Sequence, residues 1–226
     1  MLIQSLGTRL LVAVLATALF STSALAQGEN PRATASRWDI SLDLPLWPSL
    51  GDLQPAAGGS FDATGFGLGV SYHVPVAHFA SSDLLFGVDA TVAATDSSIN
   101  GLFDSALARQ LYLGGSLKWL LGEQRNYSLD AGLGYHEVDI AEVDSEWWGT
   151  RELEYWSSEK ASVFVGATWD LGAARPDHDG GLFIGLRVHF VDFGRVSDED
   201  FLSVFGPDAG TLDGPLTMLR IGYSGR

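Results

Sequence analysis

Large apolar side chains alternate with small or polar ones in the stretch GFGLGVSYHV, residues 65–74. A period of two predicts a strand with one apolar face, because successive side chains of a strand point to opposite sides. In a soluble sheet the apolar face packs into a core, whereas in a membrane barrel it faces lipid. The fold class therefore depends on which face lies outside.

Seven further segments show the same alternation and are separated by stretches rich in turn-forming residues. The eight predicted strands span residues 37–47, 65–76, 84–95, 110–121, 127–138, 160–172, 182–190 and 216–224. Strands of about ten residues are long enough to cross a bilayer when tilted, and bacterial barrels have an even strand number. The alternation slips after Glu137, which indicates a β-bulge.

The connections between these strands are alternately long and short. The long ones cover residues 48–60, 96–109, 140–159 and 196–215. Outer-membrane barrels have short periplasmic turns and longer outer loops. With the N-terminus in the periplasm, every long connection is expected on the outer side.

The first residues have the pattern of a secretory signal peptide. Arg9 precedes an apolar run from Leu10 to Phe20, and small residues follow up to Ala26. A basic start, a short apolar run and an A-x-A site predict cleavage after Ala26. The run is too short for a spanning helix, and no later segment could span as one. We therefore expect a signal peptide at residues 1–26 and one barrel domain at residues 27–226.

The charge and cysteine content exclude several classes of function. The formal net charge is −15, and removal of Arg9 makes the chain more negative still. Such acidity argues against nucleic acid as a partner, because phosphates require basic patches. The chain has no cysteine, which excludes disulfides, thiol catalysis and cysteine metal sites. We expect a monomer without a cofactor or a bound metal.

Aromatic residues recur at one end of the predicted strands, on the apolar face. They are Trp38, Tyr72, Trp119, Tyr127, Trp169 and Tyr223. Under the topology above they lie at the periplasmic ends. Girdles of Trp and Tyr at this level are typical of membrane barrels, so the apolar faces are predicted to face lipid.

The exported start, the eight strands and the alternating loop lengths resemble the small OmpA-like and OmpX-like outer-membrane barrels. The resemblance covers residues 27–226 and implies an all-β, eight-stranded, antiparallel, up-and-down transmembrane barrel in a Gram-negative outer membrane. It also implies lipid, lipopolysaccharide and the barrel assembly machinery as partners. The chain departs from the family at its end, because Ser224, Gly225 and Arg226 follow the last aromatic residue.

The opposite faces of the strands are then predicted to fill the lumen with a polar network. Its members are Asp39, Asp43, His73, Asp89, Lys118, Asp130, His136, Asp170, Arg187, His189 and Arg220. Buried charges must be paired. The tight turn at residues 122–126 sets Lys118 opposite Asp130 and predicts an ion pair there. A second pair is predicted between Arg220 and Asp39, where the first and last strands meet. Inward glycines are expected to make room for these side chains.

Two other functions use the same lumen residues. Ser71, His73 and Asp89 have the residue types of a nucleophile, a base and an orienting acid. All three alternate with the apolar side chains and are therefore predicted to point into the lumen. An enzyme acting on lipid needs a triad that the lipid can reach, so membership of the polar network is favoured. A lipid A deacylase or acyltransferase is therefore kept as an alternative. A narrow channel or carrier for small solutes is another alternative.

The long connections carry candidate contact residues. Carboxylates gather at Glu142, Asp144, Glu146, Glu152 and Glu154, and again at Asp198, Glu199, Asp200, Asp208 and Asp213. They could bind divalent cations beside lipopolysaccharide, although a solvated loop is favoured. Trp147, Trp148 and Trp156 are predicted contact residues, since exposed aromatics often mark interaction surfaces. The sequence DHDG, residues 177–180, is interpreted as a turn.

The sequence as a whole predicts a non-enzymatic outer-membrane barrel with an envelope structural or surface-interaction role. A soluble periplasmic barrel with an apolar interior is the further alternative. The membrane barrel and the soluble barrel differ in whether the apolar or the polar side chains of each strand point outward.

Overall fold

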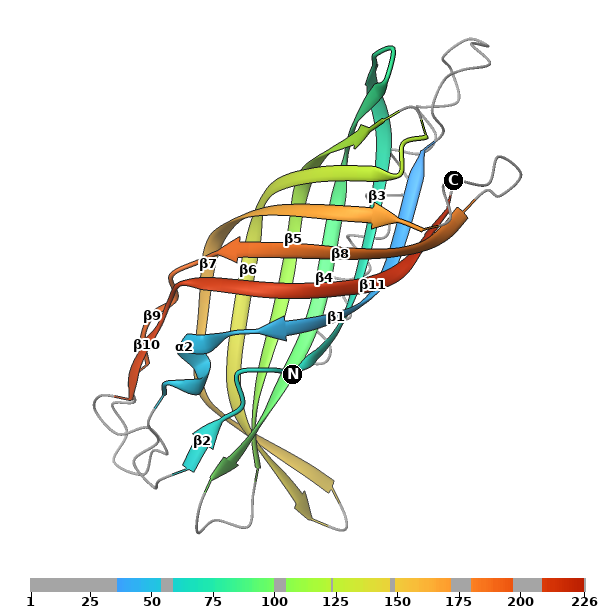
Figure 1. Ribbon diagram of the computed structural model, residues 1–226. Helices are drawn as coiled ribbons and strands as arrows, with labels where there is room; N and C mark the ends of the chain where they lie inside the picture. The colour runs from blue at the N-terminus through green and yellow to red at the C-terminus, as the bar shows by residue number, and fades with distance from the viewer. Residues whose placement is uncertain are drawn as a thin grey trace.

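The chain forms a closed antiparallel β-barrel of eight strands (Figure 1). The computed structural model describes residues 36–53, 59–99, 105–122, 124–146, 149–171, 180–196 and 209–225. The barrel strands are β1 (Arg37–Leu46), β3 (Phe66–His78), β4 (Ser82–Ile99), β5 (Ser105–Leu121), β6 (Tyr127–Glu146), β7 (Gly149–Asp170), β8 (Gly180–Phe190) and β11 (Pro215–Gly225). Each pairs with its neighbours in chain order, and β1 pairs with β11 to close the barrel. The predicted fold class is confirmed.

The described residues contain no helix that is both long and apolar enough to span a membrane.

The register of the β5–β6 hairpin is the one predicted from the turn length. Leu121 lies opposite Tyr127, and Lys118 lies opposite Asp130. The pairing of β6 with β7 shifts between Ile140 and Ala141, a few residues beyond the point where the sequence alternation slips. The hydrophobic pattern and the turn together therefore fixed the register, as expected for strands with two different faces.

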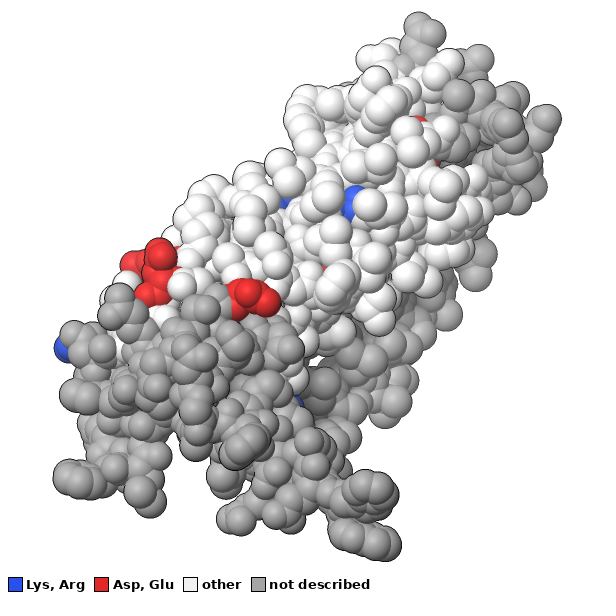
Figure 2. Space-filling view, turned by 60° about the horizontal axis from the view of Figure 1, so that its bottom comes forward, with Lys and Arg blue, Asp and Glu red and all other residues white. Residues whose placement is uncertain are grey.

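The two faces of the strands have the reverse of the burial found in a soluble barrel. Phe66, Leu133 and Leu182 are 70%, 61% and 60% exposed, whereas Asp43 and Arg187 are 0% and 1% exposed. The face of the barrel drawn in Figure 2 carries few charged side chains between its ends. Apolar side chains therefore cover the outside and polar ones fill the inside. This arrangement contradicts the alternative of a barrel built around an apolar interior.

Several strands are longer than the predicted ten residues. The backbone of residues 140–159 belongs mostly to the β6–β7 hairpin, in which Asp144 lies opposite Arg151. The predicted long connection over residues 140–159 is therefore much shorter in the structure. Alternation marks only the part of a strand that separates two different environments, whereas backbone pairing continues without it.

An apolar cluster, which we call the cap, closes one end of the barrel. The helix α2 (Pro48–Gly51) follows β1, and β9 (Gly194–Val196) pairs with β10 (Gly210–Leu212) ahead of β11. Figure 1 places α2, β9 and β10 together at the end opposite the C-terminal end of β11. The short strand β2 (Gly59–Phe61) extends the sheet beside β4. The buried cap side chains are Trp47, Leu50, Leu53, Ala108, Val138, Ile140, Val191, Phe193, Val196, Ala209, Leu212, Leu216 and Met218.

Inward glycines make room for large lumen side chains, as the sequence predicted. A Cβ atom on Gly132 would lie 2.3 Å from the ring of Phe164, and one on Gly69 would lie 2.5 Å from a carboxylate oxygen of Asp43. Neither distance is compatible with a side chain at the glycine position. The bare backbone at these points is what lets charged and aromatic groups cross the narrow lumen.

Candidate functional site

The lumen contains every residue that the sequence assigned to the polar network. Ten of them are buried, and Asp170 is half-buried. The charged members form three groups of ion pairs, whereas His136 and His189 lie among aromatic rings.

Arg187 holds the centre of the lumen. Its Nη2 donates to Asp89 Oδ1 and to Asp130 Oδ2, each at 2.8 Å. The guanidinium carbon also lies 3.8 Å from the centroid of the Phe164 ring. One buried cation thus satisfies two carboxylates from β4 and β6 and stacks on an aromatic face, which is an arrangement suited to arginine.

Lys118 pairs with Asp39 rather than with the predicted Asp130. The ammonium group reaches an oxygen of Asp39 on β1, across the lumen from β5. Arg37 Nε donates to the other oxygen of Asp39 at 2.8 Å, and Arg37 Nη1 lies 3.2 Å from Asp170. The predicted register was right, but the Lys118 side chain is long enough to cross an eight-stranded barrel, and Asp130 is already bound by Arg187.

The pair at the closing seam also differs from the prediction. Arg220 Nε donates to Asp43 Oδ1 at 3.1 Å, not to Asp39. Asp43 lies directly opposite Arg220 in the β1–β11 register, whereas Asp39 lies opposite Ser224. The residues were correctly placed in the lumen, and the register of the seam decided their partners.

The three candidate triad residues do not assemble as a catalytic set. Ser71 Oγ donates to Asp39 Oδ2 at 3.2 Å. His73 Nε2 lies 2.8 Å from Ser116 Oγ, and Ser116 donates to Asp89. Ser71 and Ser116 are 6% and 3% exposed, so both serines of this group are buried away from a lipid substrate. This geometry is that of a hydrogen-bonded lumen network.

His136 and His189 belong to the aromatic group instead of the charged network. Their ring centroids lie 5.4 Å apart, and Tyr112 lies 5.8 Å from His136 and 4.8 Å from His189. Phe193 of the cap lies 5.3 Å from His136. Within the described residues neither nitrogen of His136 has a hydrogen-bond partner. His136 therefore packs among the rings of Tyr112, His189 and Phe193, and across the described ranges no hydrogen bond joins it to the ion pairs, contrary to the prediction.

The interior also keeps buried polar atoms for which the described residues supply no partner. They include Nε and Nη1 of Arg187, the hydroxyl of Tyr112 and Nε2 of His189. Buried groups of this kind normally bind ordered water. The lumen is therefore packed with side chains yet still has polar positions to hydrate.

The predicted girdle residues lie on the outer face. Trp38, Trp119, Tyr127, Trp169 and Tyr223 are exposed, and Tyr72 is half-buried. The ring centroids of Trp38 and Tyr223 are 5.7 Å apart, and those of Tyr127 and Trp169 are 6.3 Å apart. The aromatic rings therefore form neighbouring pairs around the end of the barrel opposite the cap.

The predicted contact residues of the long connections have different outcomes. Trp156 lies on β7, is half-buried and packs against the cap, so the prediction of an exposed loop contact is wrong for it. Trp147 and Trp148 lie outside the described residues, as do residues 197–208 and 172–179. Glu142, Asp144, Glu146, Glu152 and Glu154 lie on β6 and β7. Across the described ranges no three metal-ligating side chains form a cluster.

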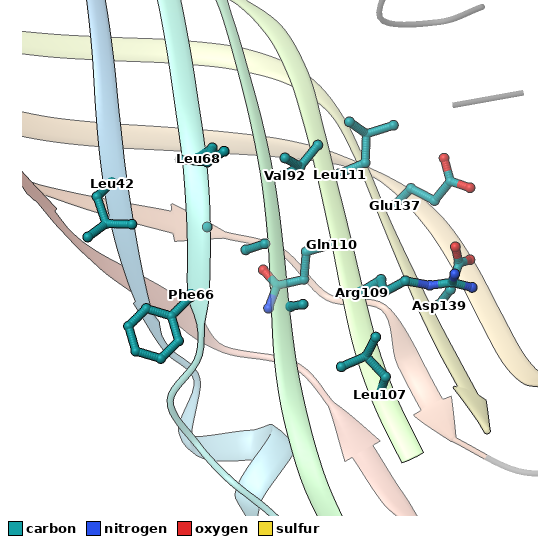
Figure 3. Close-up of a pocket in the computed structure, with 13 residues that line it drawn as sticks. Leu42, Phe66, Leu68, Val92, Leu107, Arg109, Gln110, Leu111, Glu137 and Asp139 are labelled. Carbon is teal, nitrogen blue, oxygen red and sulfur yellow. The ribbon is translucent and has the colours of Figure 1, made fainter. Parts of the chain in front are cut away.

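A hollow of about 390 Å³ lies in the outer face of the barrel wall (Figure 3). We call it the wall hollow. Two rows of outward-facing side chains cross it from strand to strand. The first row is Leu42, Leu68, Val92, Leu111 and Glu137, and the second is Phe66, Ala94, Arg109 and Asp139.

The wall hollow is apolar over most of its length and charged at one end. Its floor is made by the small residues Gly67, Ala93 and Ala94. Figure 3 shows Arg109 and Asp139 side by side at the end formed by β5 and β6, where they are cross-strand neighbours. At this surface an apolar recess meets a charged group.

Sequence reasoning missed the cap and the wall hollow. The hollow could have been suspected from small residues at 67, 93 and 94 beside bulky neighbours on the adjoining strands. A second signal was Arg109, a charged residue that alternates in phase with the outward apolar side chains of β5 and lies just beyond them. The cap left no periodic signal of its own, because it combines inward residues of β5, β6 and β11 with residues of the segments 47–53, 191–196 and 209–212.

The fold and site define a closed, charge-filled eight-stranded antiparallel barrel with an apolar exterior. No family model matches the chain, and no curated protein matches it. Among solved structures, the chain is similar to the outer membrane protein OprG from Pseudomonas aeruginosa, with 13% identity, TM-score 0.45, and coverage of 85% of this chain and 97% of that one. It is also similar to Neisserial surface protein A (12%, TM-score 0.43, coverage 84% and 94%) and to the outer membrane protease OmpT from Escherichia coli (9%, TM-score 0.40, coverage 89% and 99%). No functional argument rests on likeness at this level.

Proposed function

We propose that this protein is an outer-membrane β-barrel that acts without catalysis, as a structural or surface-interaction protein of the bacterial envelope. It belongs beside the small OmpA-like and OmpX-like barrels in architecture. Residues 1–26 act as a cleaved export signal, and the short turns face the periplasm.

The observation that carries this proposal is the constant height of the apolar exterior. Following the outward side chains from the girdle toward the cap, the first charged residue comes ten positions later on three consecutive strands. The pairs are Trp119 and Arg109 on β5, Tyr127 and Glu137 on β6, and Trp169 and Glu159 on β7. Ten residues at about 3.3 Å each, tilted by about 40°, rise about 25 Å, which is the height of the apolar band of a membrane barrel.

The interior supports a blocked lumen. Lys118 and Arg187 bind carboxylates from across the lumen, Arg220 binds Asp43 of the adjoining strand, and the cap covers the far end with buried apolar side chains. An eight-stranded barrel has an interior that side chains can fill. We therefore expect solute flux to be low, and expect the outer ends of the strands and the cap to carry the interactions of the protein.

Membrane insertion is tested by extraction and gel mobility. The expressed protein should stay in the membrane fraction after a high-salt wash and dissolve only in detergent. The folded band should migrate differently from the boiled band on a denaturing gel, as a detergent-resistant barrel would. A mature protein that is soluble without detergent would overturn the proposal.

Two further measurements test the alternatives. Planar bilayers containing the protein should show no steady single-channel conductance, and a stable open channel would favour the channel alternative. Mass spectrometry of lipid A from cells with and without the protein should give identical acylation. A change in acyl chain number would favour the lipid-modifying enzyme.

A further inference from the structure

We propose that His136 and His189 together bind one late first-row transition-metal ion, Zn²⁺ or Cu²⁺, inside the barrel beside the cap. The two imidazoles belong to β6 and β8. The inference goes beyond the proposed function. It holds or fails independently of the membrane location, because the site lies in the interior of the barrel.

The two histidine rings are spaced as ligands of one ion. Their centroids lie 5.4 Å apart, with an angle of 69° between the ring planes. Imidazole nitrogens bind zinc at about 2.0–2.1 Å, so two imidazoles on one tetrahedral ion place their ring centroids about 5 Å apart. Two rings in edge contact have a similar spacing. The partners of the ring nitrogens are therefore the observation that separates the two cases.

Three ring nitrogens of the pair lack a hydrogen-bond partner among the described residues. They are Nδ1 and Nε2 of His136 and Nε2 of His189, and both side chains are 0% exposed. Each nitrogen of a neutral imidazole is either a donor or an acceptor, and a buried one without a partner is costly. A metal ion bound between the rings would take the lone pair of one nitrogen from each.

A neighbouring hydroxyl leaves the correct nitrogen of His189 available. Its Nδ1 lies 3.5 Å from Ser162 Oγ on the adjoining strand β7. A histidine that binds a metal usually makes such a contact through its other ring nitrogen, and the contact sets the orientation of the ring. Nε2 of His189 is therefore the nitrogen that we assign to the ion.

Aromatic rings enclose the histidine pair. The centroid of Tyr112 lies 4.8 Å from that of His189, and Phe164 lies 5.2 Å from His189. Phe193 of the cap lies 5.3 Å from His136. The chain has no cysteine, so imidazole nitrogen is the strongest donor that it offers to a soft or borderline metal. Imidazole ligands favour zinc, copper or nickel over calcium and magnesium.

The adjoining ion pairs are compatible with an added cation. Arg187 lies two positions from His189 on β8, but its guanidinium is bound by Asp89 and Asp130, each at 2.8 Å. These three groups together carry one net negative charge. A divalent ion at the histidine pair would therefore adjoin a group that is negative overall.

The protein supplies two imidazoles, so water must complete the coordination of the ion. Gln110 on β5 is 4% exposed, and neither its amide oxygen nor its nitrogen has a partner within the described part of the chain. Val138, which lies opposite Gln110, is two positions from His136. Diagonal neighbours on paired strands are within reach of long side chains, so the amide can bind a water on the ion. We expect weaker binding than at a structural zinc site with four protein ligands.

The test is metal binding by the full mature chain folded in detergent. One equivalent of Cu²⁺ should bind, and its electron paramagnetic resonance spectrum should show coupling to two imidazole nitrogens. Zn²⁺ should compete for the same site and raise the urea concentration needed for unfolding. Absence of binding, or a copper spectrum without nitrogen coupling, would overturn the proposal and leave packed rings or a bridging water at this place.

Variants locate the ion. His136→Phe and His189→Phe keep a ring in the cluster, and each should lower the affinity for Cu²⁺ by at least about tenfold. His78→Phe is the matched control, because His78 lies at the end of β3 with its side chain 42% exposed, and it should leave the affinity unchanged.

Gel mobility reports folding for each variant, and the spectrum of the unmodified protein remains decisive if a variant does not fold. Unchanged affinity in either lumen variant, or an equal loss in His78→Phe, would overturn the site. A protein that binds Cu²⁺ as described but stays soluble without detergent would instead refute the proposed membrane function.

Discussion

Asp43 and Arg220 lie directly opposite each other on the first and last barrel strands, and Arg220 Nε donates to Asp43 at 3.1 Å. Ser41 Oγ donates to the same carboxylate oxygen at 2.6 Å. The barrel seam is thus held by a buried ion pair as well as by backbone hydrogen bonds. The side-chain pair is therefore part of what closes the barrel.

Removal of one member of this pair should destabilise the barrel strongly. Asp43→Asn leaves Arg220 as a buried cation without its carboxylate, which typically costs about 3–5 kcal/mol. Urea unfolding from vesicles measures the change in the free energy of unfolding. The exposed Asp62→Asn is the matched control and should stay within about 0.5 kcal/mol. A loss below about 1 kcal/mol for Asp43→Asn would show that the pair contributes little to closure.

A charge introduced on the outer wall should lower the free energy of unfolding more at mid-height than near the cap. Leu133→Arg places arginine in the middle of the apolar band and should lower the free energy of unfolding by about 2–4 kcal/mol. Glu159→Arg lies at the edge of the band and should change it by about 0–1 kcal/mol. The comparison uses urea unfolding in lipid vesicles. In water the exposed Leu133 would tolerate arginine, so equal effects at both sites would refute the membrane placement.

A side chain at Gly132 should strain the lumen. Its Cβ would lie 2.3 Å from the Phe164 ring, so Gly132→Ala should lower the free energy of unfolding by about 1–3 kcal/mol. Gly115 is the matched control, because the nearest atoms to its Cβ are at 3.7–3.9 Å. Gly115→Ala should be neutral or slightly stabilising. Phe164→Leu combined with Gly132→Ala should recover part of the loss, and purely additive effects would contradict the packing described.

The cap should contribute packing energy of its own. Trp47 is 1% exposed, and its ring centroid lies 5.5 Å from that of Phe193. Trp47→Ala should cost about 3–5 kcal/mol, as for other large core truncations. Trp38→Ala removes an exposed tryptophan at the start of β1 and should lower the free energy of unfolding clearly less in detergent. Similar losses for the two variants would show that the cap is not a packed core.

The strands and their faces could be predicted because alternation records which side chains meet lipid and which meet the lumen. The turn at residues 122–126 was tight enough to fix the opposition of Lys118 and Asp130. The partner of Lys118 could not be predicted in this way. Asp39 reaches it across the lumen, and distances across a barrel depend on closure and strand tilt rather than on sequence spacing.

The cap and the wall hollow could not be predicted from the sequence for a different reason. Each is assembled from single side chains on several segments, and no one segment shows a period or a motif. Leu50, Ile140 and Leu212 are buried together in the cap although they come from three distant parts of the chain. Trp156 was assigned to an exposed surface because it lies in a predicted long connection, whereas in the structure it lies on β7 and packs against the apolar cap.

The composition of the cap sets the order in which the molecule can fold. Trp47, Leu50 and Leu53 follow the first barrel strand, whereas the cap residues from Val191 to Leu212 lie between β8 and the last strand. These two groups are brought together by the same pairing of β1 with β11 that closes the barrel. Contacts of such large sequence separation form late, because the entropy of closing the chain must be overcome first. The cap therefore packs only after the barrel has closed, and stabilises the closed form. A chain truncated before β11 would lose both the β1–β11 seam and the packing of the cap.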